Sequence, residues 1–482
     1  MNLYIKNNTF WFELENLTRI FFPNEKIDVH REFESVEKPF ILAELGEEIA
    51  VSVAIGEFEE KRTCETGSDN NENELRTVKL LYRLLRKLSG IDQPWGLLTG
   101  VRPIKLLRKL RDEIGAEATD RRFLEDYYVS PEKLSLADMT EENERRIIAL
   151  SRPESFSLYV GVPFCPSRCS YCSFVMASVE RAGKLMQPYI DLLCEEIKAT
   201  AQLASELGLR LETVYFGGGT PTTLSAEQLD QVLGAVNAGF DMSTCREFTV
   251  EAGRPDTITE EKLFALKENK VGRISINPQT VSDEVLRAIG RRHTAQQFFD
   301  AFTLARKCGF DNINTDLIAG LPKDTAAGFR RSLDAMLGLD AECVTVHTLC
   351  MKRAATLTQD GKTLNREEAE TAREMVRYAK ETLTAHDYIP YYLYRQTRMV
   401  GNLENVGWSK RGYESLYNVY VMDETHTILA CGSGGVTKLR DPHSDFLSRV
   451  FNFKYPYEYI GRFDEILKRK SDIKRFYCDC HS

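Results

Sequence analysis

The segment SLYVGVPFCPSRCSYCSF, residues 157–174, carries three closely spaced cysteines directly after an apolar stretch. Cys165, Cys169 and Cys172 follow the spacing Cys-x3-Cys-x2-Cys, and the preceding SLYVGVP is typical of a buried strand. Twelve cysteines are scattered through 482 residues, so the disulfide framework of a small secreted protein is not indicated. Closely spaced cysteines in such a chain indicate metal binding or catalysis.

The three thiols predict a 4Fe-4S cluster with one iron left open. Iron–sulfur clusters are held by thiolates, usually four per cluster, and this segment supplies three. S-adenosylmethionine (SAM) can chelate the open iron through its amino and carboxylate groups and accept an electron, which yields a 5′-deoxyadenosyl radical. The segment therefore predicts a radical SAM centre, in which the protein positions cofactors that carry the chemistry.

Two other interpretations of these cysteines are a zinc site and buried structural thiols. A structural zinc ion takes four ligands, typically in two spaced pairs, and no partner pair fits here. Cys478, Cys480 and His481 have poor spacing and lie at a terminus, where order is often low. The strand before the cysteines and Tyr171 before the third of them favour the cluster.

Around this segment, six apolar strands alternate with amphipathic helices. The expected strands are SLYVGVP, TVYFGG, EFTVEA, GRISINP, NINTDLIAG and ECVTVHTL, and the expected helices span 187–207, 225–238, 259–268, 281–308 and 325–338. Right-handed crossovers would curl such units into a parallel sheet that forms a partial (β/α)6 TIM-like barrel. The predicted class is α/β, with the chemistry at the C-terminal ends of the strands.

Polar residues occur where these strands end. The second strand runs into Gly217, Gly218, Gly219 and Thr220, and consecutive glycines let a backbone approach a ligand closely. Carboxylates on later strand ends suit ribose hydroxyls or an ammonium group, and an arginine suits a carboxylate. The residues concerned are Glu251, Gln279, Arg291 and Asp316. A tight turn, helix caps and surface ion pairs are the structural alternatives.

The flanking sequences predict two further regions. Residues 1–150 indicate an α+β domain, with strands in LYIKNNTFWFEL, PFILAEL and EIAVSVAIGEFEE within 1–60, a loop at 59–73, a helix at 74–88 and a second helix starting near Pro103. The barrel is expected over 151–365. Residues 366–482, which begin with a helix over 366–386 and continue rich in Tyr and Gly, form a C-terminal region, in which Gly432–Gly435 predicts a lid or a loop.

Composition limits the class of protein. Hydrophobic residues make up 43% and charged residues 28%, as in ordinary globular proteins. The formal net charge of -9, without a long basic run, disfavours nucleic acid as a partner. No stretch reaches the ~20 apolar residues of a membrane span. The first residues lack the pattern of a signal peptide, so we expect a cytoplasmic protein.

Several ordered motifs resemble the oxygen-independent coproporphyrinogen III oxidase (dehydrogenase) family of radical SAM enzymes. They are LYVGVPFCPSRCSYCSF, VYFGGGTPTTLS, VEAGRPDTI, NPQTVSDEVLRAIGRRHT and DLIAGLP, which together span roughly residues 155–350. The flanking PWGLLTGVRPIK and YYLYRQTRMVGNLENVGW look specifically like the HemZ-like branch. This resemblance implies oxidative decarboxylation of two propionates of coproporphyrinogen III to vinyl groups, giving protoporphyrinogen IX in haem biosynthesis. It also implies an electron donor such as flavodoxin or ferredoxin.

The resemblance assigns roles to individual positions. The cluster ligands fall on Cys165, Cys169 and Cys172. The contacts of one SAM fall on Tyr159, Gly218 and Glu251. Family members that convert coproporphyrinogen hold a second SAM, whose contacts fall on Tyr171, Gly219, Thr220, Gln279, Arg291 and Asp316. His347, in VTVHTL, matches a family histidine, although a core histidine is an equal interpretation.

One position departs from the decarboxylating members. They carry a further cysteine two residues after the third ligand, whereas this chain has Phe174 there. Phenylalanine at this point resembles the related haem chaperone branch, which uses the same barrel to bind and deliver haem. That branch lacks the N-terminal domain. A haem-binding transfer protein, and another radical reaction on haem such as methylation or ring opening, therefore remain alternatives.

Overall fold

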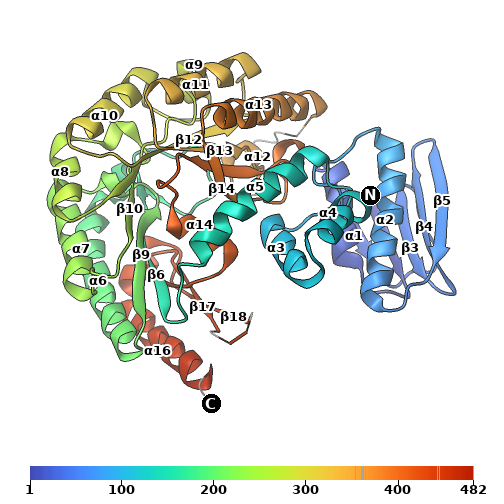
Figure 1. Ribbon diagram of the computed structural model, residues 1–482, viewed down its shortest axis with the longest axis horizontal. Coiled ribbons are helices and arrows are strands. Elements are labelled where there is room, and N and C mark those ends of the chain that lie inside the picture. The colour runs from blue at the N-terminus through green and yellow to red at the C-terminus, as the bar shows by residue number, and fades with distance from the viewer. Residues whose placement is uncertain (353, 360–362, 364, 442, 445, 481–482) are drawn as a thin grey trace. The chain divides into compact units, whose positions relative to one another are not determined.

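The computed structural model describes residues 1–352, 354–359, 363, 365–441, 443–444 and 446–480 (Figure 1). Cys480 is described only as part of the backbone, and His481 lies outside the described residues. The chain divides into two compact units. The N-terminal unit comprises Met1–Asp138, Gly361–Arg373 and Tyr394–Glu404, and the barrel unit comprises Met139–Asp360, Glu374–Leu393 and Asn405–Ser482.

A five-stranded sheet with the strand order β2-β1-β3-β4-β5 forms the base of the N-terminal unit. Its strands are β1 (Asn2–Lys6), β2 (Asp28–His30), β3 (Phe40–Leu45), β4 (Glu48–Ile55) and β5 (Phe58–Glu65). Helices α1 (Trp11–Phe21) and α2 (Asn70–Ser89) share a core with this sheet. Further helices follow in chain order: α3 (Pro103–Ile114), α4 (Ala116–Arg121), the π-helix η1 (Arg122–Asp126) and α5 (Pro131–Ile148).

Two expectations for the N-terminal unit are wrong. Residues after Lys6 form helix α1 instead of continuing as strand, because Leu14, Leu17 and Phe21 recur at helical spacing and are buried. The expected loop at 59–73 is strand β5 followed by the start of α2. The charged residues of β5 alternate between half-buried and exposed, as on an edge strand, so its polar composition resembled that of a loop. Pro103 occupies the first turn of α3, as predicted.

Six parallel strands of the barrel unit confirm the predicted partial barrel. They are β6 (Ser155–Val162), β9 (Arg210–Gly218), β10 (Glu247–Glu251), β11 (Arg273–Ser275), β12 (Ile313–Ala319) and β13 (Cys343–Thr348). Each pairs in parallel with the next in chain order. All six C-terminal ends therefore meet at one edge, which brings the polar residues that follow them to the same side of the sheet.

Helices connect these strands and lie along the outside of the curved sheet (Figure 1). They are α6 (Val179–Glu206), α7 (Ala226–Gly239), α8 (Glu260–Glu268), α9 (Asp283–Ala288), α10 (Ala295–Lys307) and α11 (Ala326–Gly338). The single helix expected over 281–308 is two helices, α9 and α10. Gly290 has a φ of 75°, which ends the first, and Thr294 forms a capping box with Gln297 that starts the second. The intervening loop carries Arg291.

The sheet continues beyond the six strands on both sides. β15 (Asn405–Ser409) pairs antiparallel with β13, and β14 (Ile389–Tyr394) follows it. On the other side, β16 (Thr427–Cys431) pairs parallel with β6, and β17 (Val436–Arg440) and β18 (Leu447–Phe451) complete the sheet. The remaining helices are α12 (Thr356–Gln359), α13 (Arg366–Ala385), α14 (Leu416–Asp423), α15 (Pro456–Gly461) and α16 (Phe463–Cys480). Across the described residues, no helix is both long and apolar enough to cross a membrane.

Candidate radical SAM site

The cysteine loop is closed by two short strands. β7 (Phe164–Cys165) directly follows β6 and pairs in parallel with β8 (Ala177–Ser178). The backbone N–H of Ala177 donates to the Pro163 carbonyl at 2.8 Å, and that of Cys172 donates to the Cys169 carbonyl at 3.1 Å. These bonds hold all three cysteines on one loop at the C-terminal end of the first barrel strand.

The surroundings of the thiols fit an anionic cluster. Burial by itself opposes the thiolate form, since it raises the pKa of Cys165 to about 11 and also raises that of Cys172, and the neighbouring cysteines add to both shifts; a positive charge offsets this effect. Arg254 is almost fully buried and places its Nη1 3.8 Å from the Cys169 Sγ. Positive charge beside buried sulfur stabilises thiolates, the form that binds iron. Within the described ranges, no group of three or more His, Cys, Asp or Glu side chains is close enough together to hold a single metal ion.

The glycine run lies against the cysteine loop. A Cβ on Gly219 would lie 2.5 Å from the Phe164 carbonyl oxygen, so only glycine allows this approach. The N–H groups of Gly219 and Thr220 donate to the carbonyls of Val162 and Phe164, each at 2.7 Å. The Thr220 Oγ1 lies 3.5 Å from the Cys165 Sγ. The backbone of the second barrel strand is thereby joined to the first cysteine.

Tyr159 and Gly218 also meet in this region. Gly218 has a φ of 106°, a conformation that favours glycine, and a Cβ built there would lie 3.3 Å from the Tyr159 hydroxyl. Burial raises the pKa of Tyr159, and the Glu251 charge adds to the shift. Tyr159, Gly218 and Glu251, the three residues expected to contact one SAM, therefore lie near one another.

Two carboxylates occupy neighbouring strand ends. The Tyr215 hydroxyl donates to the Glu251 Oε1 at 2.6 Å, and burial raises the pKa of Glu251 to about 7. Asp316 Oδ2 lies 3.5 Å from His347 Nε2, and Asn314 donates to Oδ1 at 2.8 Å. Burial opposes ionisation of Asp316, but the bond and charge of His347 lower its pKa below the ordinary value. His347 is half-buried and contacts Asp316, one of the residues predicted to contact SAM.

Arg291 joins the cysteine loop to the later strand ends. Its Nη2 donates to the Tyr171 hydroxyl at 3.2 Å, and its Nη1 donates to the carbonyls of Gly253 and Asn277. Cys169 also interacts with this guanidinium. Its Nε is buried without a hydrogen-bond partner among the residues described. Since a buried donor without a partner is costly, this atom is suited to a ligand oxygen.

Gln279 presents a second open polar atom. Its φ is 69°, an uncommon conformation for a residue other than glycine, and its backbone bonds to Asp316 at 2.9 Å and to Ile318 at 3.1 Å. The side chain is buried, and its Oε1 has no hydrogen-bond partner in the described part of the chain. Strained backbone that aims a buried, unpaired group is frequent at ligand sites.

The structure brings the sequence-predicted residues together through a series of contacts. Thr220 meets Cys165, Gly219 meets Phe164, Tyr171 meets Arg291, and Gln279 meets Asp316. Sequence reasoning missed Arg254, Tyr215 and Tyr417. Arg254 stood in the quoted VEAGRP motif, and alternation along β9 places Tyr215 on the same face as Gly217. Tyr417, on α14, stacks on Tyr215 with centroids 4.4 Å apart, and no local signal distinguished it from other tyrosines.

Comparisons with known proteins agree with this geometry. A family model described as the Radical SAM superfamily matches residues 159–336. The oxygen-independent coproporphyrinogen-III oxidase-like protein HemZ of Bacillus subtilis (strain 168) is 40% identical over 82% of this chain and 80% of its own length. The heme chaperone HemW of the same organism is 33% identical over 58% of this chain and 70% of its own length.

A solved structure also shares the fold. Coproporphyrinogen III oxidase (HemN) from Escherichia coli, described as a radical SAM enzyme, superposes with a TM-score of 0.53 at 22% identity. The superposition covers 66% of this chain and 71% of that one. The cofactors of the radical SAM family are a 4Fe-4S cluster and SAM. The strand-end site and these relatives together show that the chain belongs to the oxygen-independent coproporphyrinogen III oxidase family of radical SAM proteins, in its HemZ-like branch.

Proposed function

We propose that this chain catalyses the oxygen-independent oxidative decarboxylation of coproporphyrinogen III to protoporphyrinogen IX. The observation that carries the proposal is a pair of buried polar atoms, Arg291 Nε and Gln279 Oε1. Neither atom forms a hydrogen bond with any residue that the structure describes. Both residues follow β11 in the chain, whereas the three residues expected to contact the first SAM lie on β6, β9 and β10. The later strand ends therefore offer polar groups for a second ligand. Two SAM molecules suit a substrate that loses two carboxylates.

The cluster and the first SAM would be held at the start of the barrel. Cys165, Cys169 and Cys172 would ligate three irons of a 4Fe-4S cluster, which would supply the electron for reductive cleavage of SAM. Arg254 would balance the thiolate charge at Cys169. Tyr159, Gly218 and Glu251 would hold that SAM, with the Glu251 carboxylate accepting from its hydroxyl or ammonium groups.

The second SAM would lie across the later strand ends. Its contacts would come from six residues: Tyr171, Gly219, Thr220, Gln279, Arg291 and Asp316. Arg291 is already oriented by Tyr171 and two carbonyls, so its guanidinium is fixed before a carboxylate arrives. Gln279 Oε1 would accept from a ligand N–H or hydroxyl. Prior orientation lowers the cost of binding because few side chains need to be ordered.

The flanking regions would serve the same reaction. We assign residues 1–150 as an accessory domain, 151–365 as the barrel and 366–482 as the region that covers the tetrapyrrole. Tyr417, which stacks on Tyr215 beside Glu251, is a residue of this C-terminal region that reaches the site. An electron donor such as flavodoxin or ferredoxin would reduce the cluster.

A second candidate function is haem binding and transfer. Phe174 occupies the position of the further cysteine, and 65% of its surface is exposed. Lys352 Nζ lies 5.8 Å from the centre of its ring. An exposed aromatic ring beside a cation would suit the face and propionates of a haem. The similarity to HemW also favours this candidate.

Anaerobic turnover tests the proposal. Reconstituted protein is given SAM, a reductant and coproporphyrinogen III, and the products are separated by chromatography. We expect protoporphyrinogen IX with about two molecules of 5′-deoxyadenosine per product, one for each decarboxylation. Tight haem binding without SAM cleavage would instead support the transfer function. SAM cleavage only in the presence of haem would indicate methylation or ring opening of haem.

A further inference from the structure

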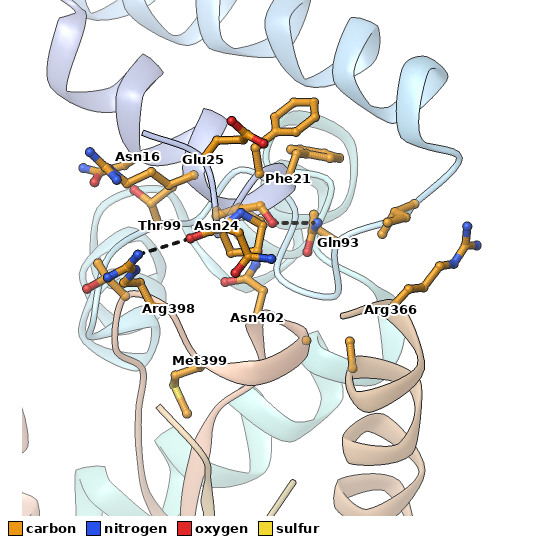
Figure 2. Close-up of a pocket in the computed structure, with 18 of the residues that line it drawn as sticks. Asn16, Phe21, Asn24, Glu25, Gln93, Thr99, Arg366, Arg398, Met399 and Asn402 are labelled. Carbon is orange, nitrogen blue, oxygen red and sulfur yellow. Dashed lines mark hydrogen bonds between the residues drawn. The ribbon is translucent and has the colours of Figure 1, made fainter. Parts of the chain in front are cut away.

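The N-terminal unit contains a cavity of its own, separate in sequence from the cysteine loop. Its volume is about 310 Å³, and every residue that lines it belongs to this unit. Four segments form its walls: residues 16–25 at the end of α1, residues 91–99, residues 365–373 and residues 396–402. Figure 2 shows Arg398 and Arg366 on opposite sides of this pocket, with Asn24, Asn402 and Gln93 between them.

The charge of the lining is predominantly positive. Four arginines face one carboxylate, that of the exposed Glu25. Arg19 is paired with Glu15, and Arg373 with Glu370. Arg366 and Arg398 form no ion pair with any residue that the structure describes, and Arg398 donates only to the Pro23 carbonyl, at 3.3 Å. Two guanidinium groups are therefore available to an anion.

Amide groups with open hydrogen-bonding atoms lie between these arginines. Asn402 Oδ1 accepts from Arg395, which fixes the amide and leaves Nδ2 as a buried donor without a partner among the described residues. Gln93 is 5% exposed, and its Nε2 donates to the Ile20 carbonyl at 3.5 Å. The Gln93 Oε1 is also buried, and it accepts no hydrogen bond from any residue in the described part of the chain. Such atoms call for a ligand or ordered solvent.

The wall at residues 398–402 has an unusual backbone. Arg398, Gly401 and Asn402 have φ values of 66°, 64° and 55°. Left-handed conformations cost energy in residues other than glycine, and they persist where the surrounding structure enforces them. A Cβ on Gly401 would lie 3.2 Å from the Ala369 carbonyl oxygen, so this segment packs closely on the first turn of α13. The enforced turn places Arg398 and Asn402 in the same pocket.

Apolar side chains complete the lining. Ile20, Phe21, Phe22 and Met399 contribute to the same wall as the polar groups. Binding pockets for small molecules commonly combine such apolar walls with a few placed polar groups. We propose that this pocket is a second ligand site, which binds a small molecule with a flat apolar ring and two or more carboxylate or phosphate groups. The inference does not depend on the reaction assigned to the barrel.

Two probes with this chemistry distinguish the sources of such a ligand. Coproporphyrin III offers carboxylates on a tetrapyrrole ring, and ATP without added metal offers phosphates on a purine. Binding of each to the full-length protein is measured by titration, and hydrogen exchange locates the bound probe. We expect one probe to slow exchange within residues 16–25 and 396–402.

Variants test the arginines. Arg366→Gln together with Arg398→Asn should weaken binding of that probe at least tenfold, because two charge-assisted contacts are lost. Asparagine is chosen because it tolerates the left-handed conformation of Arg398. Arg121→Ala, which removes an exposed arginine of the same unit, is the matched control and should leave the affinity unchanged. Equal melting temperatures would show that all variants fold.

Three results would overturn the inference: no binding of either probe, wild-type affinity in the double variant, or slowed exchange confined to the strand ends of the barrel. The last result would leave the proposed reaction intact, since coproporphyrin III would then bind only at the barrel. Conversely, slowed exchange at residues 16–25 and 396–402 without turnover in the barrel would support this pocket and count against the proposed function.

Discussion

Tyr215 and Glu251, on adjacent strands of the barrel, are joined by a hydrogen bond of 2.6 Å from the tyrosine hydroxyl to the carboxylate. Burial nevertheless dominates, and it raises the pKa of Glu251 to about 7. The nearby charge of Asp316 adds to this shift. Glu251 therefore changes charge near neutral pH, at the position where we propose that it accepts hydrogen bonds from SAM.

This shift makes stability depend on pH. The unfolded chain releases the Glu251 proton near the ordinary value of 4.5, whereas the folded protein retains it up to about 7. The contribution of Glu251 to stability is therefore fully present below pH 4.5 and is lost as pH rises through about 7, by on the order of 1–3 kcal/mol. Glu251→Gln should remove this part of the pH dependence.

The measurement is denaturant unfolding of both proteins at a series of pH values without SAM. Glu195→Gln, which changes an exposed acid on α6 of the same unit, serves as the control. Parallel pH profiles for wild type and Glu251→Gln would contradict the assignment.

Alanine at Cys165, Cys169 or Cys172 should abolish the cluster. Each variant removes one of three thiolates, so anaerobically reconstituted protein should lose its brown colour, its visible absorption and most of its iron, about four atoms per chain in the wild type. Cys64→Ala, in strand β5 of the N-terminal unit, is the control and should retain all three properties. A coloured Cys169→Ala protein would exclude that residue as a ligand.

Arg291→Lys should selectively weaken the binding of the proposed second SAM. Lysine retains the charge but lacks the planar fork that binds two carboxylate oxygens while also donating to Tyr171. We expect the affinity for a second SAM to fall on the order of tenfold, with the first unaffected. Equilibrium binding of labelled SAM measures both.

The neighbouring Arg292 provides the control for this experiment. It is exposed and forms an ion pair with Glu180, so Arg292→Lys should bind SAM as the wild type does. If Arg291→Lys bound both SAM molecules with wild-type affinity, the role that we assign to Arg291 would be wrong.

Glu404→Leu should destabilise the N-terminal unit. The Glu404 carboxylate is fully buried, accepts from Trp95 Nε1 at 2.8 Å and pairs with Lys133 at 2.6 Å. Removing it takes the close partner from the buried Lys133 ammonium group, whose next carboxylate, that of the exposed Glu132, lies 3.9 Å away; the loss costs about 3–5 kcal/mol. Thermal unfolding should show a lower melting temperature, whereas the control Glu370→Leu, at an exposed position, should melt close to the wild type. A change below about 1 kcal/mol would show that water or another group replaces the carboxylate.

The barrel was predictable because its strands are short, mostly apolar runs and its helices have a clear period. The positions of Cys165, Gly218 and Asp316 followed from the same alternation, since strand ends share one edge of the sheet. Tyr417 was not predictable, because its place beside Tyr215 depends on a chain reversal after β15 that no local pattern encodes. The pocket of the N-terminal unit was missed for the same reason: residues near 20, 93 and 400 meet only in three dimensions.

The pairing of β16 with β6 has a consequence for biosynthesis. β6 receives one neighbour, β9, soon after it leaves the ribosome, but its other neighbour is synthesised only when the chain reaches Thr427. Until then the first strand of the barrel has an open edge, which is prone to pairing with other chains. This edge of β6 therefore stays uncovered until Thr427–Cys431 has been synthesised, late in translation.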